Sequence, residues 1–114
     1  MQITMDTTIE ILILNLKPHT RGKFHEVYVT QYLPLLKKWK INVIAHGAST
    51  HDENTYFVIR SFQSLEHRQK SEDAFYGSDD WITGPRTAIL SFIESSATLV
   101  VPATTLKDWT EKIE

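Results

Sequence analysis

The segment Ile9–Leu16, with the sequence IEILILNL, constrains the fold most. Every side chain in it is apolar except those of Glu10 and Asn15. In an extended strand, successive side chains point to opposite faces of a sheet. A strand that is apolar on both faces is buried on both. The sequence therefore predicts a sheet strand over residues 9–16 with neither face left to water.

The next segments alternate between helical and extended patterns. Apolar residues at three- and four-residue spacing predict a helix that starts at Thr20 or Gly22. Pro34 is expected to kink this helix, because proline deletes one backbone donor. Strand-like runs over residues 41–49 and 55–62 flank the polar turn HDEN, which is typical of a hairpin.

A second helix follows the hairpin. Ser64 can cap it, and the helical pattern reaches about Tyr76. The side of this helix that would face the sheet is polar in its middle, at Arg68 and Glu72. A polar stripe of this kind is unusual for a helix that covers a sheet.

The connection over residues 71–94, SEDAFYGSDDWITGPRTAILSFIE, is more elaborate than an ordinary linker. Gly77 and Ser78 end the second helix, and Ser78 can cap a short turn. Gly84-Pro85 then starts another helix, because proline fits the first helical position. The last strand is expected over residues 97–103, and Pro102 indicates either an edge of the sheet or the end of the strand.

The order strand, helix, strand, strand, helix, strand predicts an α+β, ferredoxin-like βαββαβ protomer. We expect a single domain over residues 1–103 and an amphipathic tail helix over 104–114 packed on it. In this fold both helical crossovers lie on one face of the sheet. The apolar second face would then be covered by another copy, sheet to sheet, in a closed homodimer that forms a dimeric α+β barrel.

The composition excludes several classes of function. Lys and Arg number 12 against 14 Asp and Glu, and no basic stripe is present, so nucleic acid is not an expected partner. The chain has no cysteine and no histidine spacing typical of zinc, so no metal is expected. No membrane-length apolar run and no secretory signal pattern occur, so the expected location is the cytoplasm, away from the membrane.

Two ionisable residues within the hairpin strands are the candidates for catalysis. If residues 51–55 form the connection, His46 lies directly opposite Arg60. Arg60 could then hold an anion or enolate while His46 acts as a general base. The alternative is a structural pair at the rim of the sheet, hydrogen-bonded to carbonyl groups.

Six further residues are candidate ligand contacts. The aromatic ones could line an apolar pocket with hydroxyl groups, although aromatic residues at these spacings also occur as ordinary core. The charged ones form an i,i+4 pair that the helical pattern points inward. These candidates are Tyr32, Tyr56, Arg68, Glu72, Tyr76 and Trp81.

Three stretches carry a family resemblance that extends from about Ile9 to Pro102. They are IEILILNLKP followed by a helix with QYLPLL, the junction RSFQSLEHR, and FYGSDDWITGPRTAIL. In order and spacing they resemble the NIPSNAP family of the dimeric α+β barrel superfamily. The resemblance implies a ferredoxin-like protomer, homodimerisation through the sheets, and a pocket between sheet and helices. Family members often carry Arg-x-Tyr where this chain has Leu12 and Leu14, which bears on any site built there.

The resemblance leaves the activity open, because related barrels include cofactor-free monooxygenases, polyketide cyclases and haem enzymes. One hypothesis is an enzyme that acts without a cofactor on a small apolar organic molecule, by a monooxygenase or cyclase-like reaction. The other is a binding or scaffold module without chemistry. A continuous cavity that touches both His46 and Arg60 favours the first hypothesis, and a core filled by side chains favours the second.

Overall fold

The computed structural model describes residues 7–106 of the 114-residue chain. One antiparallel sheet forms one layer, with the strand order β2-β3-β1-β4. The strands are β1 (Thr8–Leu16), β2 (Asn42–Ala48), β3 (Thr55–Phe62) and β4 (Ile93–Pro102). The predicted first strand is thus confirmed, and it lies in the middle of the sheet.

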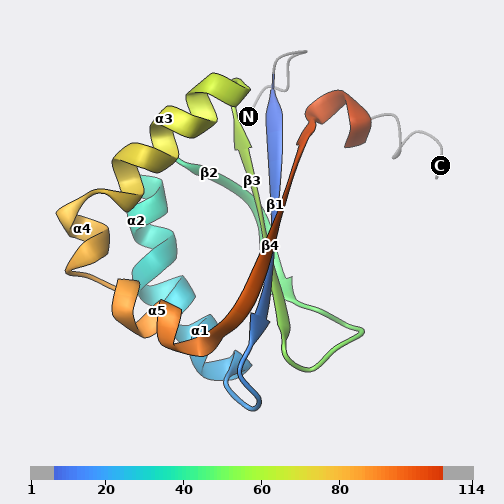
Figure 1. Ribbon diagram of the computed structural model, residues 1–114, viewed down its shortest axis with the longest axis vertical. Coiled ribbons are helices and arrows are strands. Elements are labelled where there is room, and N and C mark those ends of the chain that lie inside the picture. Colours follow the sequence, from blue (N-terminus) through green and yellow to red (C-terminus); the bar gives the residue numbers. More distant parts are fainter. Residues whose placement is uncertain (1–6, 107–114) are drawn as a thin grey trace.

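Two helical crossovers form the second layer. The first runs from β1 to β2 and the second from β3 to β4, and Figure 1 shows both on the same side of the sheet. The first contains α1 (Arg21–Val27), the π-helical segment η1 (Tyr28–Tyr32) and α2 (Leu33–Lys38), and the second contains α3 (Leu65–Tyr76), α4 (Asp79–Ile82) and α5 (Arg86–Phe92). This is the predicted ferredoxin-like α+β order.

The expected kink at Pro34 takes the form of a π-helical turn directly before it. The N–H of Leu33 donates to the carbonyl of Tyr28, five residues back, and Pro34 occupies the first turn of α2. The chain thereby continues as a helix past the proline, whose missing N–H is tolerated in a first turn. Tyr28 and Tyr32 are both buried, with ring centroids 5.2 Å apart.

The second crossover follows the predicted capping pattern. Ser64 Oγ accepts from the N–H of His67 at the start of α3, and Ser78 Oγ accepts from the N–H of Trp81 at the start of α4. Two boundaries differ from prediction: Pro85 precedes α5 rather than opening it, and β4 begins at Ile93 rather than at residue 97. The longer β4 follows from its pairing with β1, which extends as far as Leu16.

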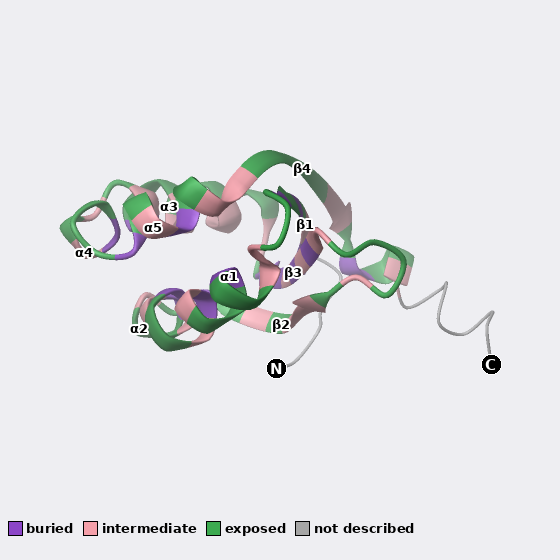
Figure 2. Ribbon diagram, turned by 90° about the horizontal axis from the view of Figure 1, so that it is seen from below, coloured by how far each residue is buried: buried purple, intermediate pink, exposed green. Residues whose placement is uncertain are grey.

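β4 is an edge strand and ends at Pro102, so both alternatives predicted from the proline are met. Most of its residues are exposed, which Figure 2 shows as a largely green strand. A helical turn over residues 103–106 follows β4, and the rest of the predicted tail helix over 104–114 lies outside the described residues. None of the helices within residues 7–106 has the length and apolar character needed to cross a membrane.

The face of the sheet that the helices leave open is apolar. The register places Ile11 opposite both Ile59 and Leu99, and Ile13 opposite Phe57, all on this face. Ile13 is 41% exposed and Leu99 is 55% exposed. This is the face that the sequence predicts a second copy to cover.

Candidate functional site

A cavity of about 190 Å³ lies between the sheet and the helices. Apolar side chains of β1, β3, α2 and α5 form much of its wall. Its polar and aromatic wall residues are Tyr28, Tyr32, Arg60, Tyr76 and Trp81. Leu90 of α5 is also part of the wall and is 46% exposed.

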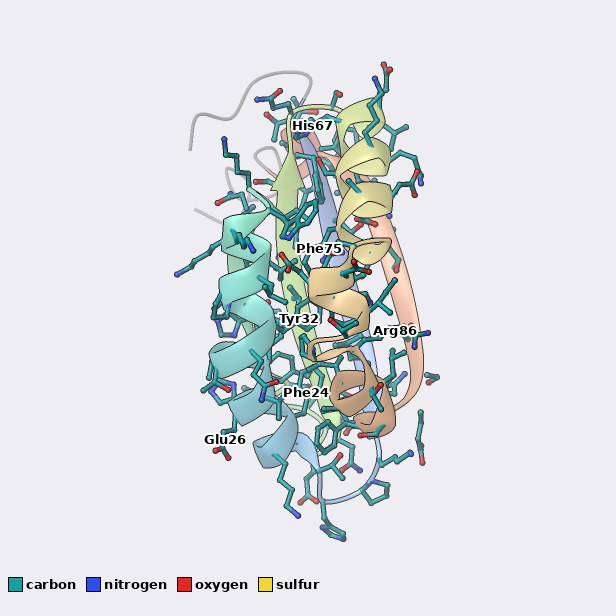
Figure 3. The ribbon with its side chains drawn as sticks, turned by 90° about the vertical axis from the view of Figure 1, so that its left-hand side faces the viewer. Phe24, Glu26, Tyr32, His67, Phe75 and Arg86 are labelled. Atoms are coloured by element: carbon teal, nitrogen blue, oxygen red, sulfur yellow. The ribbon has the colours of Figure 1, made fainter. Side chains whose placement is uncertain are left out.

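The secondary structure explains how these side chains converge. Residues two apart on a strand share one face, so Leu12 and Leu14 of β1 lie beside Val58 and Arg60 of β3 under the helices. Tyr32 comes from the opposite layer, and Figure 3 shows it between the helices of the first crossover and those of the second. The cavity is therefore enclosed by sheet and helices together.

An ion cluster of four residues lies at one end of the cavity and consists of Glu10, Arg60, Arg68 and Glu72. Glu10 Oε1 accepts from Arg60 Nε at 2.7 Å, and Glu10 Oε2 accepts from Arg68 Nε at 2.5 Å. Glu72 Oε2 is 3.3 Å from Arg60 Nη2, and Glu72 Oε1 is 3.4 Å from Arg68 Nη2. Each carboxyl group thus contacts both guanidinium groups.

Burial and the neighbouring charges shift the pKa values of the two carboxyl groups in the ion cluster. The side chains of Glu10 and Arg60 are 0% and 2% exposed. Burial alone would raise the pKa of Glu10, but its hydrogen bond with Glu72 and the charge of Arg60 bring that pKa below the ordinary value. Burial and the neighbouring Glu10 carboxylate raise the pKa of Glu72 to about 8. With Glu72 protonated near neutral pH, the cluster carries one net positive charge.

A chain of hydroxyl groups connects the ion cluster to the cavity. Arg60 Nη1 donates to Tyr76 Oη at 2.7 Å, and Tyr76 Oη is 2.5 Å from Tyr32 Oη. The third hydroxyl, that of Tyr28, is buried and has no hydrogen-bond partner among residues 7–106. Burial raises the pKa of both Tyr28 and Tyr32, so both phenols stay protonated.

His46 does not lie opposite Arg60, so that expectation is wrong. His46 pairs with Val58, and the β2 residue opposite Arg60 is Val43. The reason is the hairpin connection: Ala48, rather than Thr50, faces Tyr56. The partner of His46 is shifted by two residues, from Arg60 to Val58. Side chains two residues apart on a strand lie on the same face, so His46 is still on the helix-covered face.

His46 instead belongs to a separate cluster near the end of the sheet. Its Nδ1 is 2.8 Å from Tyr56 Oη, and His25 Nδ1 is 2.9 Å from the same oxygen. Neither His46 nor Tyr56 is part of the cavity wall. Burial and the nearby His25 lower the pKa of His46. The structure therefore does not join His46 and Arg60 in one constellation.

The other predicted ligand contacts divide into two groups. Tyr32, Tyr76 and Trp81 line the cavity together with Arg60. Arg68 and Glu72 lie outside its wall, but they reach it through their contacts within the ion cluster. The inward direction predicted for the polar stripe of α3 is confirmed.

Two residues of the site were missed by the sequence analysis. Glu10 stood out as a charge within an apolar strand, but that pattern could not show which cations would meet it. Tyr28 fits the apolar spacing of the first helix, and nothing in that spacing distinguishes its hydroxyl from that of a core tyrosine.

No group of three or more His, Cys, Asp or Glu side chains within residues 7–106 is arranged to hold a metal ion. The ion cluster has two carboxyl groups, but both are engaged by guanidinium groups.

The described residues form a ferredoxin-like α+β fold with a cavity between the sheet and its helices. A sequence model of the NIPSNAP family matches residues 9–107. The chain therefore belongs to the NIPSNAP family. None of the curated proteins compared matches the sequence.

Solved structures share the fold at low sequence identity. An uncharacterised NIPSNAP-like domain protein from Burkholderia xenovorans has a TM-score of 0.79 at 13% identity, covering 86% of this chain and 85% of that one. A NIPSNAP family protein of unknown function from Agrobacterium tumefaciens has a TM-score of 0.78 at 16% identity, covering 90% and 93%. A candidate antibiotic biosynthesis monooxygenase from Nitrosomonas europaea has a TM-score of 0.66 at 10% identity, covering 90% and 94%.

Proposed function

We propose that the cavity between sheet and helices binds a small, mostly apolar organic molecule. The observation that carries this proposal is a cavity of about 190 Å³ with largely apolar walls and one buried hydroxyl, that of Tyr28, without a partner among the described residues. An apolar cavity of roughly 150 Å³ is known to accept benzene. A molecule built on one ring with small substituents therefore fits here.

The same cavity supports an enzymatic role without a cofactor, in a monooxygenase or cyclase-like reaction. Arg60 and the hydroxyls of Tyr32 and Tyr76 would stabilise negative charge that develops on a bound molecule. The similarity in fold to a candidate monooxygenase agrees with this role. The second candidate is a binding module without chemistry. The separation of His46 from the cavity favours it, because no histidine or carboxylate among residues 7–106 then lines the cavity as a general base.

Filling the cavity is expected to weaken ligand binding. Leu12→Trp places a larger side chain in the wall, so the affinity for a neutral probe such as 4-nitrotoluene should fall about ten-fold or more. Quenching of tryptophan fluorescence or calorimetry measures the affinity. Leu65→Trp, at a position that is 61% exposed, is the matched control and should bind as the wild type does. Equal binding by both variants would contradict the proposal.

We also propose that the protein is a homodimer whose sheets pack through the open face. Apolar residues of β1, β3 and β4 occupy that face, and Ile13 and Leu99 are among the most exposed large hydrophobic residues described. Packing two such faces together would remove an apolar patch larger than monomers usually expose. An obligate interface of this kind buries more than ~1,200 Å² in total.

Light scattering should report about twice the chain mass of 13.2 kDa. Ile13→Glu places a charge in the centre of the open face and is expected to give a monomer, because the unpaired carboxylate would be desolvated in the dimer. Ile82→Glu, at an exposed position of α4, should leave the mass unchanged. A wild-type protein that stays monomeric at micromolar concentration would refute the dimer.

A further inference from the structure

The polar groups that face the cavity act as hydrogen-bond donors. Arg60 Nη1 donates to Tyr76 Oη, so that oxygen already accepts one bond. The hydroxyls of Tyr32 and Tyr76 bond to each other, and whichever one donates, the other keeps its proton for another partner. Tyr28 supplies a further O–H. The tyrosines of the cavity wall therefore hold two phenolic protons that no residue among 7–106 accepts.

Strong acceptors are absent from this wall within the part of the chain that the structure describes. No carboxylate lines the cavity, because Glu10 and Glu72 are held behind it by Arg60 and Arg68. A ligand amine or amide N–H could donate only to neutral phenolic oxygens among residues 7–106 of this wall, and such bonds are weaker than those to a carboxylate. An acceptor oxygen, by contrast, satisfies the donors.

The net charge of the ion cluster favours the binding of an anion in the cavity. The charged groups that face Glu72 are Glu10 from β1, Arg60 from β3 and Arg68 from its own helix, and Tyr76 reaches it through Arg60. When Glu72 is protonated, two guanidinium groups face one carboxylate. A net positive charge in a poorly hydrated site is stabilised by a nearby anion.

We propose that the molecule bound in this cavity is a compact aromatic or conjugated compound with a single anionic oxygen, a phenolate or an enolate, which accepts from Tyr28 and from the Tyr32 and Tyr76 pair. This inference rests on the proposed binding function and names its ligand class. Arg60 supplies the positive charge behind the donors, and the proton on Glu72 keeps the ion cluster positive.

The test compares 4-nitrophenol with 4-nitrotoluene, which is similar in size but has no ionisable oxygen. The phenolate and the phenol differ in their absorption spectra, so the bound form is observed directly. We expect the phenolate to bind about ten-fold more tightly than the phenol, because a favourable electrostatic coupling stabilises the ionised form. Preferential binding of the phenol, or no preference, overturns the inference.

Two conservative variants test the roles of Tyr28 and Glu72 in phenolate binding. Tyr28→Phe should weaken phenolate binding about ten-fold and change the affinity for 4-nitrotoluene less than about two-fold, because only the hydroxyl is lost. Equal losses for the two probes contradict the contact with Tyr28.

The second variant, Glu72→Gln, keeps the shape of the protonated carboxyl group. In the wild type, phenolate affinity should fall about five-fold from about pH 7.5 to about pH 9.5, because Glu72 loses its proton and the cluster becomes neutral. In Glu72→Gln the affinity should stay constant. A wild-type affinity that is independent of pH would contradict the role of Glu72.

The two probes also separate this inference from the proposed function. If 4-nitrotoluene binds to the wild type and Leu12→Trp weakens that binding, the cavity is the binding site. This result supports the proposed function even if the phenolate binds no more tightly than the phenol. If neither probe binds, both the ligand class and the proposed function are refuted.

Discussion

Replacing Arg60 with methionine is expected to lower the free energy of unfolding by about 3–5 kcal/mol, because it removes one partner of a buried ion pair. The Arg60 side chain is 2% exposed, and the Glu10 carboxylate that it contacts is fully buried. Methionine fills much of the volume but carries no charge, so among residues 7–106 Glu10 keeps only Arg68 as a cationic partner. Urea denaturation followed by circular dichroism measures the effect.

Lys70→Met is the matched control, because it also replaces a long cationic side chain. Lys70 pairs with Glu66 on α3, and the two side chains are 76% and 78% exposed. Such a surface pair contributes little, so the free energy of unfolding should change by less than about 0.5 kcal/mol. If both variants unfold at the wild-type midpoint, the ion cluster does not stabilise the fold.

Trp81→Ala is expected to destabilise the protein by about 3 kcal/mol or more, since it leaves a void in the core. The Trp81 ring lies 4.7 Å from that of Tyr32, 5.7 Å from that of Phe75 and 5.3 Å from that of Tyr76, measured between centroids. It is 5% exposed. Differential scanning calorimetry measures the lowered transition temperature.

The neighbouring residue provides the control. Ile82 belongs to the same short helix and is 47% exposed, so Ile82→Ala should cost well under about 1 kcal/mol. An unchanged transition in Trp81→Ala would mean that the indole does not anchor the second crossover. That result would leave Trp81 as a ligand contact only.

Local patterns predicted the fold well, because caps and strand periodicity depend on neighbouring residues. Ser64 and Ser78 begin helices where expected, and the apolar run at β1 is a central strand. The hairpin register was not predictable in the same way. It depends on the connection over residues 49–54, and a different length there moved the partner of His46 to Val58.

The candidate site was predicted in part. Of the aromatic residues expected to line a pocket, Tyr32, Tyr76 and Trp81 line the cavity and Tyr56 does not. The polar stripe of α3 was expected to point inward, and the contacts of Arg68 agree with this. The pairing of Glu10 with Arg60 and Arg68 joins β1, β3 and α3, which lie far apart in the chain. Such long-range contacts leave no periodic signal in a single sequence. Association through the open face remains a prediction.

The central strand β1 also has a consequence for how this protein could diversify. Leu12 and Leu14 line the cavity, while Ile11 and Ile13 lie on the opposite face of the sheet. Substitutions at adjacent codons therefore act on different surfaces. A mutational library confined to Leu12 and Leu14 would vary the ligand preference of the cavity. Ile11 and Ile13, and any contact made through them, would stay the same.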